Sequence, residues 1–287
     1  MNELLFGHRP LDFADLASLF EGKKDEEIDI TKLNFISIIN KSIEAGFKHL
    51  EINGDLLYVF PHLFTPDKIG LLKDIKSKLG LSFSVHLPLW GIEPAAFSPH
   101  IRKAAVEAFT DAINLTKELD PICYVIHPTG SLTVEFLRMN INNKIKNLAV
   151  NQFTNYAKES LNLLIESIDF PTKKIAVENI EFPFELMYKV IEELDLGICF
   201  DTGHLLAGYS GEIEIMSFLD RYYDKIVEIH LHDGRFPAVD HKTLGSLDLP
   251  VKEFMDFLIK KKFKGPIVYE LSLQESIDSM HIIKELY

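Results

Sequence analysis

Short apolar runs rich in β-branched residues recur along the whole 287-residue chain, and a longer amphipathic segment separates each run from the next. Two of these segments, Ile101–Leu119 and Asn151–Ile168, repeat their apolar residues at the spacing of one helix face. No Pro/Ser-rich linker, low-complexity stretch or block of like charges divides the eight units, so we expect one domain over residues 1–287. The predicted strands are Glu3–Gly7, Lys48–Ile52, Ser82–Leu87, Ile122–His127, Lys174–Glu178, Leu196–Asp201, Ile226–Leu231 and Pro266–Leu271.

The alternation within these strands favours a closed barrel. Residues at even offsets share a strand face. The face that also carries the last polar residue of each strand is mostly small or modest in size: Ser84, Val125, Ala176, Cys199, Glu228 and Val268. The opposite face is bulky and apolar: Val85, Ile126, Val177, Phe200, Ile229 and Tyr269. Limited volume near an axis, with bulky side chains under surrounding helices, predicts a (β/α)8 TIM barrel, with a doubly wound open sheet as the alternative.

Seven of the eight predicted strands finish with a carboxylate or an imidazole. These residues are Glu51, His86, His127, Glu178, Asp201, His230 and Glu270. In a parallel barrel all carboxyl ends open onto one face, so we expect these side chains to converge in one mouth. Four carboxylates gathered there would repel one another strongly, and a multivalent cation relieves that cost. Mixed oxygen and nitrogen ligands indicate zinc or manganese.

The loops after the strands extend this set of chemical groups. His204 follows Asp201 by three residues, and Asp240 with His241 lies in a later loop; we expect these to bind metal or substrate. Further candidates for the mouth are Trp90, the one tryptophan, and the pair His232 and Asp233. Packing or surface roles are expected for the other histidines, His8, His49, His62, His100 and His281, and core positions for Cys123 and Cys199.

The charge balance limits the partners. The chain has 30 Lys and Arg against 43 Asp and Glu, a formal net charge of −13, which disfavours duplex nucleic acid because phosphate backbones are bound mainly by Lys and Arg. A small or phosphorylated substrate remains compatible with a local cation site. No apolar run is long enough to span a membrane and no secretory signal is visible, so we expect a cytoplasmic protein.

The ordered set VHLP, IHP, VEN, FDTGH, HLHD, DH–x–x–LG and YEL resembles the xylose-isomerase-like barrels of the endonuclease IV-type superfamily, also called AP endonuclease family 2. This resemblance implies a divalent-metal enzyme. In the sugar isomerases and epimerases of the superfamily, one ion is held by residues matching Glu178, Asp201, His230 and Glu270. The two glutamates then move a proton between carbons.

The endonuclease-type hydrolases of the same superfamily imply a larger cluster of three ions. Residues matching His86 and His127 join Glu178 on one ion, and those matching His204 and His241 with an aspartate, here Asp240, hold a third. One departure is that the family's Asp–x–His reads Asp240–His241, with no residue between. Barrels of this type often form dimers, so a homodimer is compatible with the resemblance.

The joint presence of His86, His127 and His241 favours a multi-metal hydrolase of a small or medium phosphodiester, such as a cobamide-remodelling hydrolase. The alternative is a sugar or sugar-phosphate isomerase or epimerase with Glu178 and Glu270 as the acid/base pair. A further alternative is an abasic-site DNA endonuclease. The catalytic candidates are Glu178, Glu270 and His204. The metal candidates, for one to three zinc or manganese ions, are His86, His127, Glu178, Asp201, His204, His230, Asp240, His241 and Glu270. The substrate-binding candidates are Glu51, Trp90 and His232.

Overall fold

Eight parallel strands close into a barrel in the computed structural model, which describes residues 4–11, 15, 22 and 29–287. Around the barrel the strand order is β1-β10-β7-β6-β5-β4-β3-β2, so chain neighbours pair and the last barrel strand, β10, closes on the first. The barrel strands are β1 (Leu5–His8), β2 (His49–Asn53), β3 (Ser82–His86), β4 (Tyr124–Ile126), β5 (Ile175–Glu178), β6 (Gly197–Asp201), β7 (Ile226–His230) and β10 (Pro266–Tyr269). This is the predicted (β/α)8 TIM barrel.

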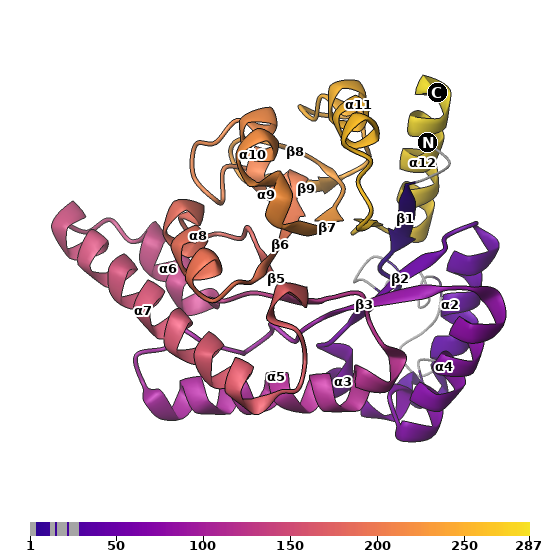
Figure 1. The fold of residues 1–287 in the computed structure, drawn as a ribbon, viewed down its shortest axis with the longest axis horizontal. Coiled ribbons are helices and arrows are strands. Elements are labelled where there is room, and N and C mark those ends of the chain that lie inside the picture. Colours follow the sequence, from indigo (N-terminus) through magenta and orange to yellow (C-terminus); the bar gives the residue numbers. More distant parts are fainter. Residues whose placement is uncertain (1–3, 12–14, 16–21, 23–28) are drawn as a thin grey trace.

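Helices follow one another around the strands, as Figure 1 shows from α2 and α4 through α5 and α7 to α10, α11 and α12. The helix α12 lies beside β1, so the two ends of the barrel meet (Figure 1). The helices are α2 (Phe35–Glu44), α3 (Leu56–Val59), α4 (Pro66–Leu79), α5 (Pro99–Thr116), α6 (Ser131–Arg138), α7 (Asn143–Ser167), α8 (Phe184–Glu193), α9 (Thr202–Leu206), α10 (Ile215–Tyr222), α11 (Val251–Lys261) and α12 (Leu273–Leu286).

The two faces of the strands divide as the alternation predicts. Val125, Ala176 and Cys199 form a small buried cluster with Cys123, separate from the main core. The bulky residues of the opposite face, such as Phe200 and Tyr269, belong to the large cluster under the helices. Burial of these apolar side chains is the main favourable contribution to folding.

Glu228, the exception to the apolar pattern, makes polar contacts inside the barrel. Its Oε1 accepts a hydrogen bond from the Ser84 hydroxyl at 2.9 Å, and its Oε2 accepts one from the Cys123 thiol at 3.0 Å. A buried carboxyl group is tolerated when it is hydrogen-bonded in this way.

Two helices, α7 and α5, have other bounds than the sequence predicts. The helix α7 begins at Asn143 rather than near residue 151, because the Asn142 side chain caps it by accepting the N–H of Lys144. Its first turns carry the exposed residues Ile145 and Leu148, so they lack the buried stripe on which the expectation rested. The helix α5 ends at Thr116, and a 3-10 turn continues to Leu119.

The loop after β7 contains a hairpin that the sequence analysis did not predict. Its antiparallel strands are β8 (Asp233–Arg235) and β9 (Val239–Lys242). The sequence also predicts an insertion between residues 8 and 30 that either closes over the mouth or lies at its rim, and this segment falls mostly outside the described residues. In the described part of the chain, no helix combines the length and apolarity needed to cross a bilayer.

Candidate metal centre

Three predicted carboxylate ligands from three strand ends converge around the imidazole of a fourth predicted ligand, His230. Its Nδ1 lies 3.2 Å from Glu270 Oε1, 3.6 Å from Glu178 Oε2 and 3.8 Å from Asp201 Oδ2. All four side chains are buried, and one ligand atom from each lies within 4.8 Å of the others. The topology of the parallel barrel therefore brings these residues together as the sequence predicts.

The chemistry of this group fits a divalent cation. Nδ1 of His230 is buried and makes no hydrogen bond within the described part of the chain, although three carboxylates face it. Buried polar nitrogen atoms are normally paired, and a metal ion would satisfy this one together with the carboxylate oxygens. Three carboxylates and one imidazole are a ligand set that suits manganese or zinc.

The VEN and FDTGH segments position Asp201 through local hydrogen bonds. Asn179 holds the backbone of Asp201 from both sides: its Oδ1 accepts the Asp201 N–H at 2.7 Å, and its Nδ2 donates to the Asp201 carbonyl at 2.9 Å. Asp201 is also the N-cap of α9, because its Oδ1 accepts the N–H of His204 at 2.6 Å. Its other carboxylate oxygen, Oδ2, faces the centre.

A second group of ligands adjoins the first through Glu178. The Nε2 atoms of His86 and His127 lie 3.2 and 3.1 Å from Glu178 Oε2. One ligand atom from each of these three residues lies within 4.8 Å of the others. Glu178 therefore belongs to both groups: its Oε2 faces His86, His127 and His230 Nδ1, while its Oε1 lies 3.1 Å from His204 Nδ1.

A third group gathers around α9 and the hairpin. His204 Nε2 lies 3.7 Å from Asp240 Oδ2, and His241 Nδ1 lies 3.3 Å from the same oxygen. Neighbouring residues of a strand point to opposite faces, so Asp240 and His241 should diverge. They do not, because His241 adopts a left-handed φ of 49°, which is uncommon for a residue with a side chain. Asp240 and His241 therefore face the same group although no residue separates them in the sequence.

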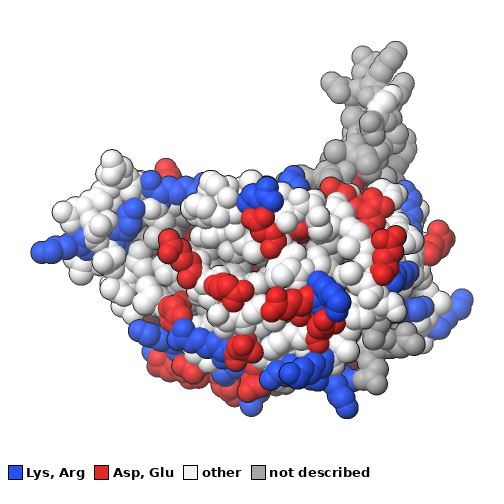
Figure 2. Space-filling view, turned by 90° about the horizontal axis from the view of Figure 1, so that it is seen from above, with Lys and Arg blue, Asp and Glu red and all other residues white. Residues whose placement is uncertain are grey.

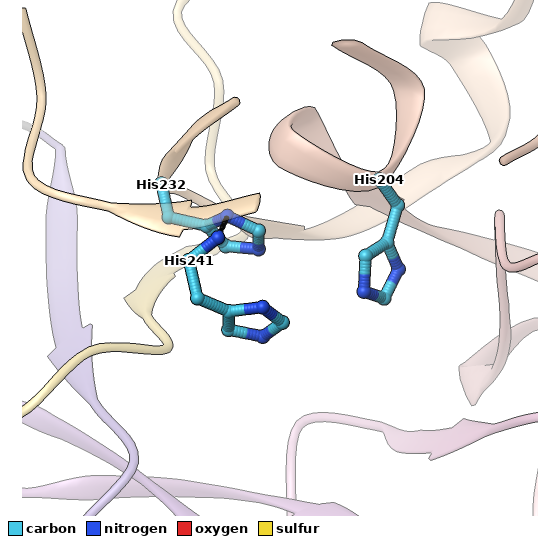
Figure 3. A group of neighbouring side chains, drawn as sticks. All are labelled: His204, His232 and His241. Atoms are coloured by element: carbon cyan, nitrogen blue, oxygen red, sulfur yellow. Dashed lines mark hydrogen bonds between the residues drawn. The ribbon is translucent and has the colours of Figure 1, made fainter. Parts of the chain in front are cut away.

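His232, predicted to contact substrate, instead supports the centre. Its Nδ1 accepts the backbone N–H of His241 at 2.9 Å, so Nε2 carries the proton and donates to Asp201 Oδ2 at 2.9 Å. Figure 3 shows the His232 and His241 rings stacked, with His204 approaching from α9 on the other side. Although the three imidazoles lie close enough to share an ion, both ring nitrogens of His232 already have partners.

Glu51, the other predicted substrate contact in the barrel, lies behind His230. Its Oε2 is 3.1 Å from His230 Nε2, the ring nitrogen opposite the one that faces Glu178, Asp201 and Glu270, and the Glu51 side chain is fully buried. The structure therefore places Glu51 where it can orient a ligand rather than touch a substrate in the mouth. Glu51 is the middle residue of β2, which continues to Asn53, so Glu51 lies level with Ser84 and Asn53 takes the position level with His86.

Charges across the centre shift the pKa values of its acids. Burial alone would raise the pKa of Glu178, but the neighbouring imidazoles of His127 and His230 hold it well below its usual range. Burial likewise acts against ionisation of Glu270, and the Arg9 guanidinium with His230 holds the pKa of Glu270 well below normal. Arg9 forms an ion pair with the Glu270 carboxylate.

The same charges act on the histidines. Burial lowers the pKa of His204, but the carboxylates of Asp201 and Glu178 outweigh it and raise that pKa to about 9. Burial is also outweighed at His241, where Asp240 and Glu270 raise the pKa to about 10. Without a cation these imidazoles therefore hold protons that metal binding would release.

A cavity of about 440 Å³ opens above the second and third groups. Trp90 lines it, as the sequence analysis expects, and its side chain is 41% exposed. Thr129, Glu181 and Tyr209 also line the cavity. The strand-end pattern does not include these three residues, because they follow their strands by several residues. It does not include Arg9 either, because β1 ends at His8, one residue later than predicted.

The remaining predictions concern packing. His8 is buried and bonds to the Ser42 hydroxyl and the Leu271 carbonyl, and His49 is buried between Ser82 and Ser84. Both cysteines are buried free thiols. Asp233 accepts the N–H groups of Leu247 and Leu249 and so holds the loop between them.

Comparison with known proteins identifies the family. A family model described as "Xylose isomerase-like TIM barrel" matches residues 39–286. The chain belongs to this family. It is 24% identical to the uncharacterized protein MJ1311 of Methanocaldococcus jannaschii, over 91% of this chain and 89% of that protein. It is 23% identical to fructoselysine 3-epimerase of Shigella flexneri, over 79% of this chain and 82% of that protein.

Solved structures agree with the barrel. The crystal structure of a D-tagatose 3-epimerase-like protein superimposes with a TM-score of 0.69 and 22% sequence identity, covering 90% of this chain and 94% of that one. Together with the ligand groups, membership of the family supports an enzyme with a site for divalent metal. The hydrolase expectation gains no support from these relatives, whose names include epimerases and no hydrolase.

Proposed function

We propose that this protein is a metal-dependent epimerase that inverts carbon 3 of a ketose or ketose derivative. The observation that carries the proposal is the placement of Glu178 and Glu270. Their carboxylates lie 3.6 and 3.2 Å from the same nitrogen of His230, Nδ1. Glu178 ends β5 and Glu270 follows β10, and two other strands, β6 and β7, lie between β5 and β10 in the barrel. The similarity to fructoselysine 3-epimerase and to the D-tagatose 3-epimerase-like structure supports this reaction class.

Epimerisation next to a carbonyl group needs a base on one face of the carbon and an acid on the other. One glutamate removes the proton from carbon 3, the electron pair moves toward the carbonyl oxygen, and the other glutamate returns a proton to the opposite face. The low pKa values of Glu178 and Glu270 keep the glutamate that acts as the base ionised. The other glutamate must carry a proton before it can return one, and a neighbouring protonated imidazole can supply it: His241 Nε2 lies 3.4 Å from Glu270 Oε2, and His204 Nδ1 lies 3.1 Å from Glu178 Oε1. A divalent ion held by Glu178, Asp201, His230 and Glu270 would polarise the oxygens beside the reacting carbon.

The lining of the cavity supports an uncharged sugar over a phosphorylated one. Among the described residues that line it there is no Lys or Arg, whereas Glu181 and Asp240 bring carboxylates. Phosphate groups are usually bound by Arg, Lys or backbone N–H groups. Trp90 and Tyr209 offer aromatic faces to the C–H face of a sugar.

Duplex DNA receives no support as a substrate. The formal net charge is −13. On the face drawn in Figure 2, acidic side chains lie across the middle, and Lys and Arg lie mostly toward the margins.

Phosphodiester hydrolysis is the second candidate, because one specific observation favours it. His86, His127 and Glu178 form a further ligand group beside the first. A second ion there would provide the paired metals that phosphodiester cleavage commonly uses. Epimerisation requires only the ion of the first group.

The deciding experiment incubates the purified protein and Mn²⁺ with a panel of free ketoses in D₂O and follows the sugars by NMR. We expect deuterium at carbon 3 together with the epimer, and no such exchange for Glu178→Gln or Glu270→Gln. A parallel assay uses bis(p-nitrophenyl) phosphate. Its hydrolysis without any carbon exchange, with two or three ions per chain, would reject the epimerase in favour of the hydrolase.

A further inference from the structure

The interior of the barrel below the centre contains a chain of hydrogen bonds rather than apolar side chains alone. It comprises Ser82, His49, Ser84 and Glu228, and it ends beside Glu51 and His230. Apart from Ser82, these side chains are fully buried. Buried polar groups in a barrel interior take the place of apolar packing, so their presence calls for a role.

The direction of the Ser84–Glu228 hydrogen bond sets the direction of the others. The Ser84 hydroxyl donates to Glu228 Oε1 at 2.9 Å, so its oxygen accepts from Nε2 of His49, also at 2.9 Å. His49 is therefore protonated on Nε2, and its Nδ1 accepts the Ser82 hydroxyl at 2.8 Å. In this series of hydrogen bonds, each residue from Ser82 onward donates to the next, and the series ends at Glu228.

Glu228 in turn adjoins the outer side of the metal ligand. One oxygen of Glu228 lies 3.6 Å from His230 Nε2, and Glu51 Oε2 lies 3.1 Å from the same nitrogen. The ligand atoms of these three residues all lie within 4.8 Å of one another. Two carboxyl groups therefore flank Nε2, while Nδ1 faces Glu178, Asp201 and Glu270.

We propose that Glu51 is a positioning residue that fixes His230 as an Nε2–H donor so that Nδ1 is presented to the metal, and that Glu228, at the end of the interior hydrogen-bond chain, supports the same nitrogen from a greater distance. A histidine that binds metal through one nitrogen needs an acceptor for the proton on the other, and a carboxylate there also increases the basicity of the ligand. No other described element offers His230 Nε2 a hydrogen bond as short as the one to Glu51.

This role concerns the metal centre that the proposed function uses, yet it holds for either reaction. The test therefore does not need a substrate. Protein labelled with ¹⁵N in histidine is titrated with Zn²⁺ in the presence of a competing chelator, and the ring nitrogens of His230 are followed by NMR. We expect zinc at Nδ1 and a proton on Nε2 in the wild type, whereas a proton on Nδ1 in the zinc-loaded protein would overturn the proposal.

Variants then measure the contribution of the supporting groups. We expect Glu51→Gln to weaken zinc binding at His230 by about 10–100-fold, in line with other carboxylates behind metal-binding histidines. Glu228→Gln and Ser84→Ala should weaken it less, because Glu228 lies farther from His230 Nε2 than Glu51 does, at 3.6 Å against 3.1 Å, and the Ser84 hydroxyl, among the described residues, bonds only to Glu228 and His49. Equal affinity of wild type and Glu51→Gln, with the circular dichroism spectrum of a folded barrel, would reject the role of Glu51.

Ser42→Ala is the matched control. Ser42, like Ser84, is a buried serine whose hydroxyl lies 2.9 Å from a ring nitrogen of a buried histidine, here His8. It lies on α2, outside the barrel interior. Removing the Ser42 hydroxyl should lower the free energy of unfolding without changing zinc affinity. If Ser42→Ala lowered zinc affinity as much as Ser84→Ala does, the loss in Ser84→Ala would reflect reduced stability and not a role in positioning His230.

Discussion

His232 donates its Nε2–H to Oδ2 of Asp201 at 2.9 Å, while its Nδ1 accepts the backbone N–H of His241 at 2.9 Å. One imidazole thus connects a strand-end ligand to the hairpin that carries Asp240 and His241. Gly203 makes room for it, because a Cβ atom at residue 203 would lie 2.0 Å from His232 Nδ1. The glycine of the FDTGH segment is therefore required by packing against the metal centre.

Gly203→Ala should destabilise the protein and weaken metal binding. The added methyl group must displace the His232 ring or the start of α9, and such overpacking costs about 1–3 kcal/mol in the free energy of unfolding. Urea unfolding of the metal-free protein measures this change. Zinc titration should show weaker binding, because Asp201 loses its hydrogen-bond donor.

Gly70→Ala serves as the control for that substitution. Gly70 lies inside α4, where a Cβ atom would meet nothing within 4 Å, so alanine should raise the free energy of unfolding by about 0.5–1 kcal/mol. If both variants were equally stable, the argument from the close approach of Gly203 to His232 would fail.

The barrel and most of its strand-end cluster could be predicted because the signals are local. Alternation along a strand places neighbours such as Cys199 and Phe200 on opposite faces, and this pattern can be recognised within a few residues. The parallel topology then brings the carboxyl ends of all strands to one face of the barrel. The convergence of Glu178, Asp201, His230 and Glu270 follows from that topology alone.

The details that escaped prediction depend on distant residues or on unusual backbone. The depth of Glu51 follows from the length of β2, which continues to Asn53, so that Glu51 pairs with Ser84 and not with the strand-end residue His86. The left-handed φ of His241 reverses the direction that alternation predicts for its side chain. His232 has the correct parity for the mouth, but its partners belong to α9's N-cap and to the hairpin.

His127→Ala should separate the two candidate reactions. His127 contacts Glu178 and lines the cavity, but it is outside the four-residue ligand group. An epimerase should therefore retain most of its kcat and show a higher KM, because substrate contacts are lost. A hydrolase that needs a second ion should lose kcat by 100-fold or more, on the order of the loss for a missing catalytic group. Steady-state kinetics with the active substrate measures both constants.

Metal removal should lower stability, and Asp201→Asn should abolish that difference. Metal at about 100 times its Kd adds about 2.7 kcal/mol to the free energy of unfolding, because it binds the folded state. Asparagine keeps an oxygen that can accept the His204 N–H and cap α9, so the variant should fold. Urea unfolding with Mn²⁺ and with a chelator measures the difference for each protein. A full metal-dependent gain in Asp201→Asn would remove Asp201 from the ligand set.

Acid should destabilise the metal-free protein through His49, whose burial lowers its pKa from 6.5 to about 3. Above pH 6.5 this imidazole is neutral in both the folded and unfolded states, so it contributes no pH dependence. Between about pH 6 and pH 4 the unfolded chain takes up a proton that the folded protein refuses. The free energy of unfolding therefore falls by about 1.4 kcal/mol per pH unit on account of this group.

His49→Gln isolates that contribution. The glutamine side chain can bond to a neighbouring serine hydroxyl but does not titrate, so its unfolding free energy should fall less steeply with acid. Urea unfolding at pH 6.5, 5.5 and 4.5 in the presence of chelator gives both slopes, and their difference should approach 1.4 kcal/mol per pH unit. Other titrating groups are common to the two proteins and cancel in that difference. Identical slopes would mean that the barrel interior accepts a charged imidazole, contrary to the burial of His49 among Ser82, Ser84 and the inner face of the strands.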